Sequence, residues 1–317
     1  MQTDLTNGSV LKNIALFSLP FFLSYFLQTL YGLADLFIIG QFDGVDSITA
    51  VSIGSQIMHM ITVMIVGLSM GATVCIAQAV GAKDKEKLRY CIGNTVTVFF
   101  IVSLILTGLL LFYTDFIVGV VKTPTEAVAG TKEYLIICFI GIPLITAYNI
   151  VSSILRGMGD SKSPMYFIAI ACVANIILDY VFIGYFKLGA VGAALGTTLS
   201  QGISVICALT YINRNNSNDS FSFAYLKLKG NIAKRLLRIG IPICAQDGFI
   251  QVAFMVITVI ANMRGLTDAA AVGIVEKLIS FIFLVPSSML STVSAMGAQN
   301  IGAGKIDRAK QTLRYAI

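Results

Sequence analysis

Eight apolar segments, each long enough to cross a lipid bilayer as a helix, dominate this chain of 317 residues. A hydrocarbon core about 30 Å thick requires ~20 helical residues. The segments lie near 14–40, 47–78, 90–113, 133–155, 165–186, 190–212, 236–262 and 268–300. They are continuously apolar rather than alternating, which favours helices over a membrane barrel. We therefore predict an all-α polytopic membrane protein.

The proportion of charged residues supports this class. Hydrophobic residues make up 56% of the chain and charged residues only 12%, about half the ~25% found in soluble domains. A water-soluble core cannot bury so much apolar surface, so the excess must face lipid. The lipid bilayer is therefore the first partner that the sequence predicts.

Basic residues are distributed unevenly between the two predicted faces of the membrane. With a cytoplasmic N-terminus, the inner segments include the basic stretches 83–89 and 227–238. The outer loops hold only Lys122, Lys132, Lys187 and Arg264. This asymmetry predicts a cytoplasmic N-terminus. It also explains the net charge of +6 by proximity to anionic lipid, so a nucleic-acid partner is not expected.

The sequence begins to repeat itself at a shift of 221–222 residues. Residues 77–82 (AQAVGA) match 298–303 (AQNIGA), and 50–53 (AVSI) match 271–274 (AVGI). Six spans separate the two copies, and an even number gives both copies the same orientation. The first span therefore matches the seventh, and the second matches the eighth.

This repeat predicts the domain organisation. Residues 1–212 form a six-helix N-terminal lobe, and the polar segment 213–235 is a cytoplasmic linker. Residues 236–317 form a partial second lobe with two helices and the start of a third. The chain then carries about eight of an expected twelve transmembrane helices, and we expect it to be C-terminally incomplete.

Two acidic residues inside the spans have matching depths. Asp35 precedes Gly40 by five residues, and Asp179 precedes Gly184 by five. Both helices run from inside to outside, and five residues correspond to ~7.5 Å of helix. Both carboxyls should therefore lie at one level in the outer half of the membrane. Acids at such depth cost about 2.5–3.5 kcal/mol each on insertion scales, so a function is expected of them.

Two further polar residues should join these acids. Asn175 is one helical turn deeper than Asp179 on the same face, and Thr197 in the next span reaches a similar depth. Carboxyls, a carboxamide and a hydroxyl form an all-oxygen cluster that can hold a proton or a hard cation such as Na⁺. The alternative is a static hydrogen-bonded network that joins helices.

Three other positions are weaker candidates. Asp247 and Gln251 in the seventh span and Glu276 in the eighth could form a secondary polar site or line a substrate cavity. In the structural interpretation, the neighbouring Gln246 satisfies the Asp247 carboxyl and Glu276 finds a partner on another helix. Pro20 is expected at mid-span in the first helix, where it predicts a kink.

Catalytic signatures are missing from the sequence. It has no Walker A loop, no His/Cys metal set and no nucleophile elbow or catalytic triad. The glycine-rich residues 156–160 (RGMGD) lie between two apolar spans, so a tight cytoplasmic turn is expected. A channel would need a ring of pore-lining charges. We predict neither an enzyme nor a channel, and no cofactor.

Four segments resemble the multidrug and toxin extrusion (MATE) family. They are 33–40 (LADLFIIG), 77–82 (AQAVGA), 155–160 (LRGMGD) and 175–179 (NIILD). The resemblance implies a monomeric carrier in the bacterial inner membrane, built from two six-helix lobes that face a central cavity. It further implies export of organic, often cationic, drugs or toxic compounds in exchange for H⁺ or Na⁺.

Within this family the sequence is most similar to the branch related to DNA-damage-inducible protein F. That resemblance implies an ion-coupling site on Asp35 and Asp179, with Asn175 and Thr197 as companions. It also matches Pro20 to the proline at which the first helix is proposed to bend. The NorM branch instead carries a glutamate in its seventh helix, and the corresponding position here is Gln251, so coupling through the second lobe is not expected.

One alternative within transport remains, a lipid-linked oligosaccharide or polysaccharide flippase of the same superfamily. A flippase should line its cavity with several cations that bind pyrophosphate. The spans of the N-terminal lobe show acids, and we expect no buried arginine among them.

Overall fold

The computed structural model describes residues 4–215, 223–264 and 266–317, and these residues contain helices but no strand. The long helices are α1 (Val10–Phe42), α2 (Val45–Gly81), α3 (Lys85–Phe112), α7 (Lys162–Asp179), α8 (Gly189–Asn215), α9 (Gly230–Arg264) and α10 (Leu266–Gly302). The shorter helices are α4 (Thr114–Val120), α5 (Val128–Ile140), α6 (Ile142–Gly157) and α11 (Ile306–Ala316). Three single turns are η1 (Thr125–Ala127), η2 (Tyr180–Tyr185) and η3 (Phe223–Leu226).

Helix length and hydropathy confirm a polytopic membrane protein. In the described part of the chain, seven helices are long and apolar enough to cross a membrane, and an eighth span results when α5 and α6 are taken together. These two helices meet at a 46° bend. Gly141 separates them, and Pro143 occupies the first turn of α6, where a missing N–H costs nothing. The sequence pattern predicted one unbroken span here, and this detail was wrong.

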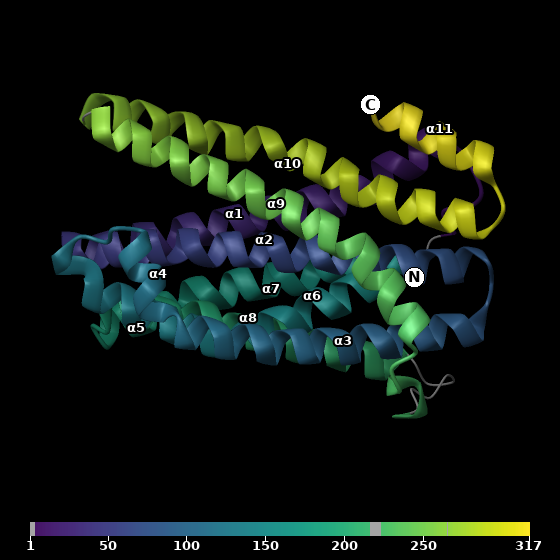
Figure 1. The fold of residues 1–317 in the computed structure, drawn as a ribbon, viewed down its shortest axis with the longest axis horizontal. Coiled ribbons are helices and arrows are strands. Elements are labelled where there is room, and N and C mark those ends of the chain that lie inside the picture. The colour runs from purple at the N-terminus through teal and green to yellow at the C-terminus, as the bar shows by residue number, and fades with distance from the viewer. Residues whose placement is uncertain (1–3, 216–222, 265) are drawn as a thin grey trace.

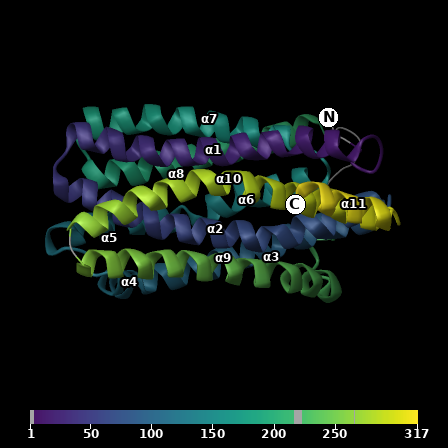
Figure 2. The ribbon, with the colours of Figure 1, turned by 90° about the horizontal axis from the view of Figure 1, so that it is seen from above.

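The long helices run side by side along the longest axis of the molecule (Figure 1). Helices α1 to α3 and α5 to α8 form one bundle, and α9 and α10 lie together on one side of it. In the view from above, α10 follows the α1–α2 side and α9 follows the α2–α3 side (Figure 2). Both chain termini lie toward one end of the bundle, here called the terminal end.

The second helix has matching bounds in the two copies of the repeat. Helices α2 and α10 are both 37 residues long, and both begin and end at positions 221 residues apart. Each is followed by a residue with a left-handed backbone, Lys83 with φ of 56° and Gly304 with φ of 73°. Glycine adopts this conformation without strain, whereas lysine does so at a cost.

The matching glycines of the repeat also meet in space. A Cβ atom added to Gly81 would strike the backbone oxygen of Gln299, and one added to Gly302 would strike the backbone oxygen of Gln78. Each helix therefore presents its glycine to the backbone of the other. This reciprocal contact is what a parallel repeat about an axis along the bundle produces.

The segment expected to be a linker is partly helical. Helix α8 continues to Asn215 and α9 already begins at Gly230, so residues 230–235 belong to a helix. Between them, η3 packs on α3, where Thr97 Oγ1 donates to the Leu226 oxygen at 2.8 Å and the Lys229 N–H donates to Asn94 at 2.8 Å. Residues 216–222 of the predicted linker lie outside the described residues.

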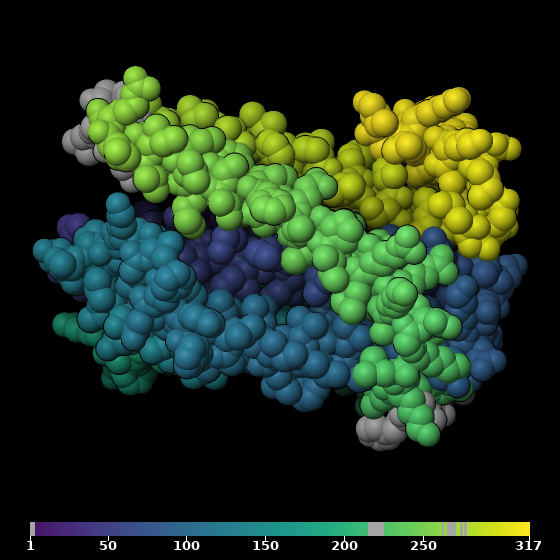
Figure 3. Space-filling view, viewed as in Figure 1, coloured from purple at the N-terminus to yellow at the C-terminus, as the bar shows by residue number. Residues whose placement is uncertain are grey.

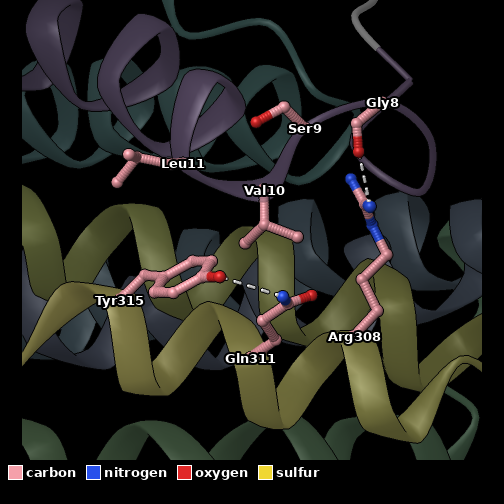
Figure 4. Close-up of a pocket in the computed structure, with 7 residues that line it drawn as sticks. All are labelled: Gly8, Ser9, Val10, Leu11, Arg308, Gln311 and Tyr315. Carbon is pink, nitrogen blue, oxygen red and sulfur yellow. Dashed lines mark hydrogen bonds between the residues drawn. The ribbon is translucent and has the colours of Figure 1, made fainter.

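The N-terminal segment, residues 4–9, joins α1 to α10 and α11 at the terminal end of the bundle. Lys305 Nζ donates to the Thr6 oxygen at 2.8 Å, and Arg308 donates to the oxygens of Gly8 at 2.7 Å and Asn7 at 2.8 Å. Figure 4 shows Arg308 reaching Gly8 beside a pocket of about 470 Å³ between this segment and α11. Leu5 is fully buried here beside residues of α1 and α10.

Away from the terminal end, α9 separates from the bundle. It packs closely on α2 from Leu236 to Gly248, but beyond that point its apolar side chains are largely exposed, as at Phe249 and Val256. The space-filling view shows the surface hollowed between α9 and helices α3 and α4, with the earlier helices at its floor (Figure 3).

Candidate functional site

A cluster of four polar residues lies inside the bundle between α1, α7 and α8. Asp35 comes from α1 and is 3% exposed, while Asn175 and Asp179 come from α7 and are 1% and 0% exposed. Thr197 on α8 donates a hydrogen bond from Oγ1 to Asp35 Oδ2 at 3.2 Å. The structure thus brings together the four residues that the sequence grouped in one cluster.

Apolar packing surrounds this cluster. Among the described residues, the largest buried apolar cluster draws most of its side chains from α1, α2, α5 and α8. Ile38 and Ile39 follow Asp35 in the next turn of α1, and Tyr134 of α5 is 2% exposed. The Tyr134 ring packs so closely on α2 that a Cβ atom at Gly54 would overlap it. Water is therefore largely excluded from the sides of the cluster.

A π-helical turn follows the cluster on α7. Helix α7 ends at Asp179, and the π-turn η2 begins at the next residue. The Phe186 N–H bonds to the Val181 oxygen at 2.9 Å, five residues back. Such turns occur frequently at functional sites. Periodicity cannot predict this turn, because one wider turn leaves the apolar pattern of the span almost unchanged.

The outer ends of α1 and η2 meet beside the cluster. Phe42 at the end of α1 lies against Gly184, whose added Cβ would be 3.3 Å from the ring, and it contacts Tyr180 edge-on at a centroid distance of 6.0 Å. This contact aligns the two helix ends. The contact lies at the end of the bundle opposite the termini.

The cluster is poor in hydrogen-bond partners. Among the described residues, Asp35 Oδ1, both carboxyl oxygens of Asp179 and both polar atoms of the Asn175 carboxamide are buried without one. Asp35 and Asp179 nevertheless face each other closely enough to interact directly. Two adjacent buried carboxyls cannot both be ionised in an apolar bundle unless a cation lies between them, and otherwise one of them holds a proton. The arrangement is therefore suited to bind a proton or a cation.

Gly196 is a member of this site that the sequence did not single out. It lies on α8 next to Thr197, and a Cβ atom added there would overlap Asp179 Oδ1. The only sequence signal is the spacing of glycines 189, 192 and 196 on one helix, which is also common in ordinary helix packing.

Asp247 and Gln251 lie elsewhere, on α9. The Asp247 carboxyl packs against α2, where a Cβ atom at Gly67 would be 2.7 Å from Oδ2. It is only partly buried, and Gln251 follows one turn later, also partly exposed. Helix α9 does not pack against α1, α7 or α8 in the described structure. The structure therefore does not bring these residues to Asp35, and the side chain of Glu276 lies outside the described residues.

Pro20 lies inside α1, which remains one helix from Val10 to Phe42. Pro20 is the eleventh of the 33 residues of this helix, in the third nearest the terminal end rather than at mid-span. One turn later, Ser24 Oγ donates to the Pro20 oxygen at 2.7 Å.

Arg156 corrects the expectation that no arginine is buried in the N-terminal lobe. It is 7% exposed, and its guanidinium lies 4.6 Å from the centre of the Phe21 ring. Sequence placed it at a cytoplasmic turn, but α1 covers the side chain and the aromatic face stabilises its charge. The following residues do form the predicted turn, in which Asp160 accepts hydrogen bonds from the N–H groups of Lys162 and Ser163.

These features define a polytopic α-helical membrane protein with a buried acidic cluster. The model of the MatE family matches residues 20–181 and 242–317, so the chain belongs to the MatE family of membrane transporters. The match covers the helices from α1 to α7 and from α9 to α11.

Individual relatives extend the comparison. The chain is 32% identical to the probable multidrug resistance protein YoeA of Bacillus subtilis, covering 98% of this chain and 68% of that protein. It is 27% identical to the multidrug export protein MepA of Staphylococcus haemolyticus, with the same coverage. A solved multidrug resistance MATE family transporter in an outward-facing conformation superposes with a TM-score of 0.86 at 25% identity, covering 98% of this chain and 69% of that one.

Proposed function

We propose that this protein is a secondary active antiporter that exports organic, often cationic, drugs or toxic compounds in exchange for H⁺ or Na⁺. Membership of the MatE family supports transport, and the relatives named for multidrug resistance and export support this substrate class. Asp247 supports a preference for cations, because it supplies a partly exposed carboxyl on α9.

The observation that carries the ion coupling is the set of buried polar atoms without partners around Asp35, Asn175 and Asp179. In a fixed hydrogen-bonded network each oxygen would face a donor, whereas the carboxyls of Asp35 and Asp179 face each other and offer only acceptors when ionised. A proton shared between the carboxyls would satisfy them. Oxygens of the two carboxyls, the Asn175 carboxamide and the Thr197 hydroxyl also match the preferences of Na⁺.

Coupling follows from the position of the cluster between three helices. Binding of the ion removes repulsion between Asp35 on α1 and Asp179 on α7, so it changes the stability of their packing. Substrate and ion then drive transport if they favour opposite conformations. We propose Pro20 as the point at which α1 bends during this change, because proline leaves one carbonyl of the helix without its N–H partner.

The orientation and setting are part of the same proposal. The terminal end carries the basic loops at residues 83–89 and 227–238, so we place it in the cytoplasm of a bacterial inner membrane. The protein then acts as a monomer, without a cofactor, resident metal or nucleic-acid partner. A lipid-linked oligosaccharide flippase fits less well, because Arg156 is one cation stacked on Phe21 rather than a group of cations lining a cavity.

The decisive test is gradient-driven efflux of a fluorescent organic cation from proteoliposomes. Asp179→Asn keeps the size of the side chain but cannot carry the charge, so we expect at least about a tenfold loss, equivalent to ~1.4 kcal/mol. Asp46→Asn, an exposed acid in the first turn of α2, is the matched control and should keep its activity. Separate H⁺ and Na⁺ gradients identify the ion. Unchanged efflux by Asp179→Asn would disprove the coupling mechanism.

A further inference from the structure

Gly196 makes room for a fully buried carboxyl, whereas several other tightly packed glycines make room for the backbone of a neighbouring helix. Cβ atoms added at Gly81, Gly240 and Gly302 would strike backbone oxygens of a neighbouring helix. A Cβ atom at Gly196 would instead overlap a side-chain atom, Asp179 Oδ1, and would lie 3.2 Å from Cγ of the same residue. Its absent side chain therefore accommodates a carboxyl rather than a helix crossing.

The contact with Asn175 supports the same interpretation. The nearest other atom to the added Cβ is Asn175 Nδ2 at 3.6 Å, an ordinary packing distance. An alanine at position 196 would thus conflict with one movable group only. The backbone of α7 could stay in place while the Asp179 carboxyl is pushed away from α8.

Two consecutive residues of α8 act on the two acids. Thr197 donates to Asp35, and Gly196 allows Asp179 to lie directly against the helix backbone. The residues of α8 thereby hold both carboxyls in one arrangement. Because charge interactions vary steeply with separation in a buried site, a small displacement of Asp179 should change how strongly the pair holds an ion.

Among the described residues, no basic group offsets the charge interaction between Asp35 and Asp179. Asp35 from α1 is the titratable group that acts on Asp179, and no lysine or arginine of the described chain acts on either acid. Around Asp35 the other titratable groups are Tyr31 from α1, Tyr134 and Cys138 from α5 and Cys172 from α7. Burial acts on both carboxyls, and their relative position is the further influence on ion affinity that a neighbouring residue can adjust.

We propose that Gly196 is a positioning residue that sets the distance between Asp179 and Asp35 and thereby the ion dependence of transport. This inference rests on the proposed coupling function. It assigns to α8 a role beyond the Thr197 hydrogen bond, since a residue without a side chain determines where the acid lies.

The test compares Gly196→Ala with Gly202→Ala on the same helix. A Cβ atom at Gly202 would make an ordinary contact of 3.6 Å with Leu144, so this variant should behave as the parent protein. Gly196→Ala should fold, with efflux driven by H⁺ displaced in its pH midpoint by about one unit, or by Na⁺ displaced about tenfold in half-saturating concentration. An unchanged ion dependence in folded Gly196→Ala would overturn the proposal.

A double variant separates this proposal from the coupling itself. If Gly196 acts through the Asp179 carboxyl, Gly196→Ala should change the ion dependence of the parent but add nothing in an Asp179→Asn background. Failure of Asp179→Asn to alter ion dependence would remove the coupling function. An effect of Asp179→Asn without any effect of Gly196→Ala would remove only the positioning role.

A second variant covers the case in which Gly196→Ala does not fold. Truncation by Asp179→Ala removes the atoms that the new Cβ would strike, so Asp179→Ala/Gly196→Ala should recover the melting temperature of Asp179→Ala alone. Failure to recover would show that position 196 contacts something other than the carboxyl, and the proposal would be wrong.

Discussion

Single residues determine how the two acids are held, and few contacts hold them. Asp35 has one hydrogen bond among the described residues, from Thr197, and Asp179 has none. Spacing along the chain was sufficient to group Asp35, Asn175, Asp179 and Thr197, with Asn175 one turn deeper than the acids, because helix rise is constant. It could not reveal Gly196, since the space that a glycine leaves is defined by another helix.

Removal of the Thr197 hydroxyl should weaken the site without disturbing the fold. Thr197→Val keeps the shape of the side chain and deletes the bond to Asp35 Oδ2. A hydrogen bond of this kind contributes about 0.5–1.5 kcal/mol, so we expect ion-driven efflux to fall roughly two- to tenfold. Thr210→Val, which loses only a bond to the Ile206 oxygen on the same helix, should retain full transport. Equal activity of both variants would argue against a role for Thr197.

Whole helices show where local patterns stop being informative. The apolar runs predicted every span, because each must match the bilayer thickness. They did not predict the bend at Gly141 or the π-turn after Asp179, both of which leave hydropathy unchanged. The repeat predicted that α2 corresponds to α10, yet the reciprocal contact of Gly81 and Gly302 appears only when the helices are placed together.

The close contact between α2 and α10 can be tested with two glycines of α10. Gly302→Ala should destabilise the protein by about 1–3 kcal/mol, because its Cβ would meet the backbone oxygen of Gln78, which cannot move aside easily. Gly297→Ala, with no atom within 4 Å of its added Cβ, should leave stability unchanged or slightly higher. Thermal unfolding in detergent measures both. Similar melting temperatures for the two variants would contradict the close helix contact.

The molecule as a whole is joined at the terminal end by its N-terminal segment. Backbone oxygens of this segment accept hydrogen bonds from Lys305 and Arg308, beyond the end of α10. Asp4 shapes the segment through hydrogen bonds from Thr6, which lower the pKa of its carboxyl. A lowered pKa stabilises the turn above the ordinary pKa of an aspartate, and this contribution is lost as the pH falls through the lowered value. The turn is therefore intact at neutral pH.

Loss of the two cations should open this junction. In a protein with Leu5→Cys, a residue that is fully buried in the parent, Lys305→Ala/Arg308→Ala should increase the rate of thiol labelling several-fold, because several hydrogen bonds of about 1 kcal/mol each are removed. Lys310→Ala/Arg314→Ala, which removes two exposed cations of α11, is the matched control. Equal labelling rates in the two double variants would show that the N-terminal segment is held by apolar packing alone.

The sequence by itself determined the membrane class, the spans, the repeat and the depth of Asp35 and Asp179, because hydropathy, spacing and self-similarity are read along one chain. Tertiary structure decided the surroundings of those acids: the missing partners of Asp179, the space at Gly196 and the stacking of Arg156 on Phe21. Each of these depends on helices far apart in sequence. The energy of a buried carboxyl depends on every neighbour within a few ångströms, and that environment exists only after the helices have packed.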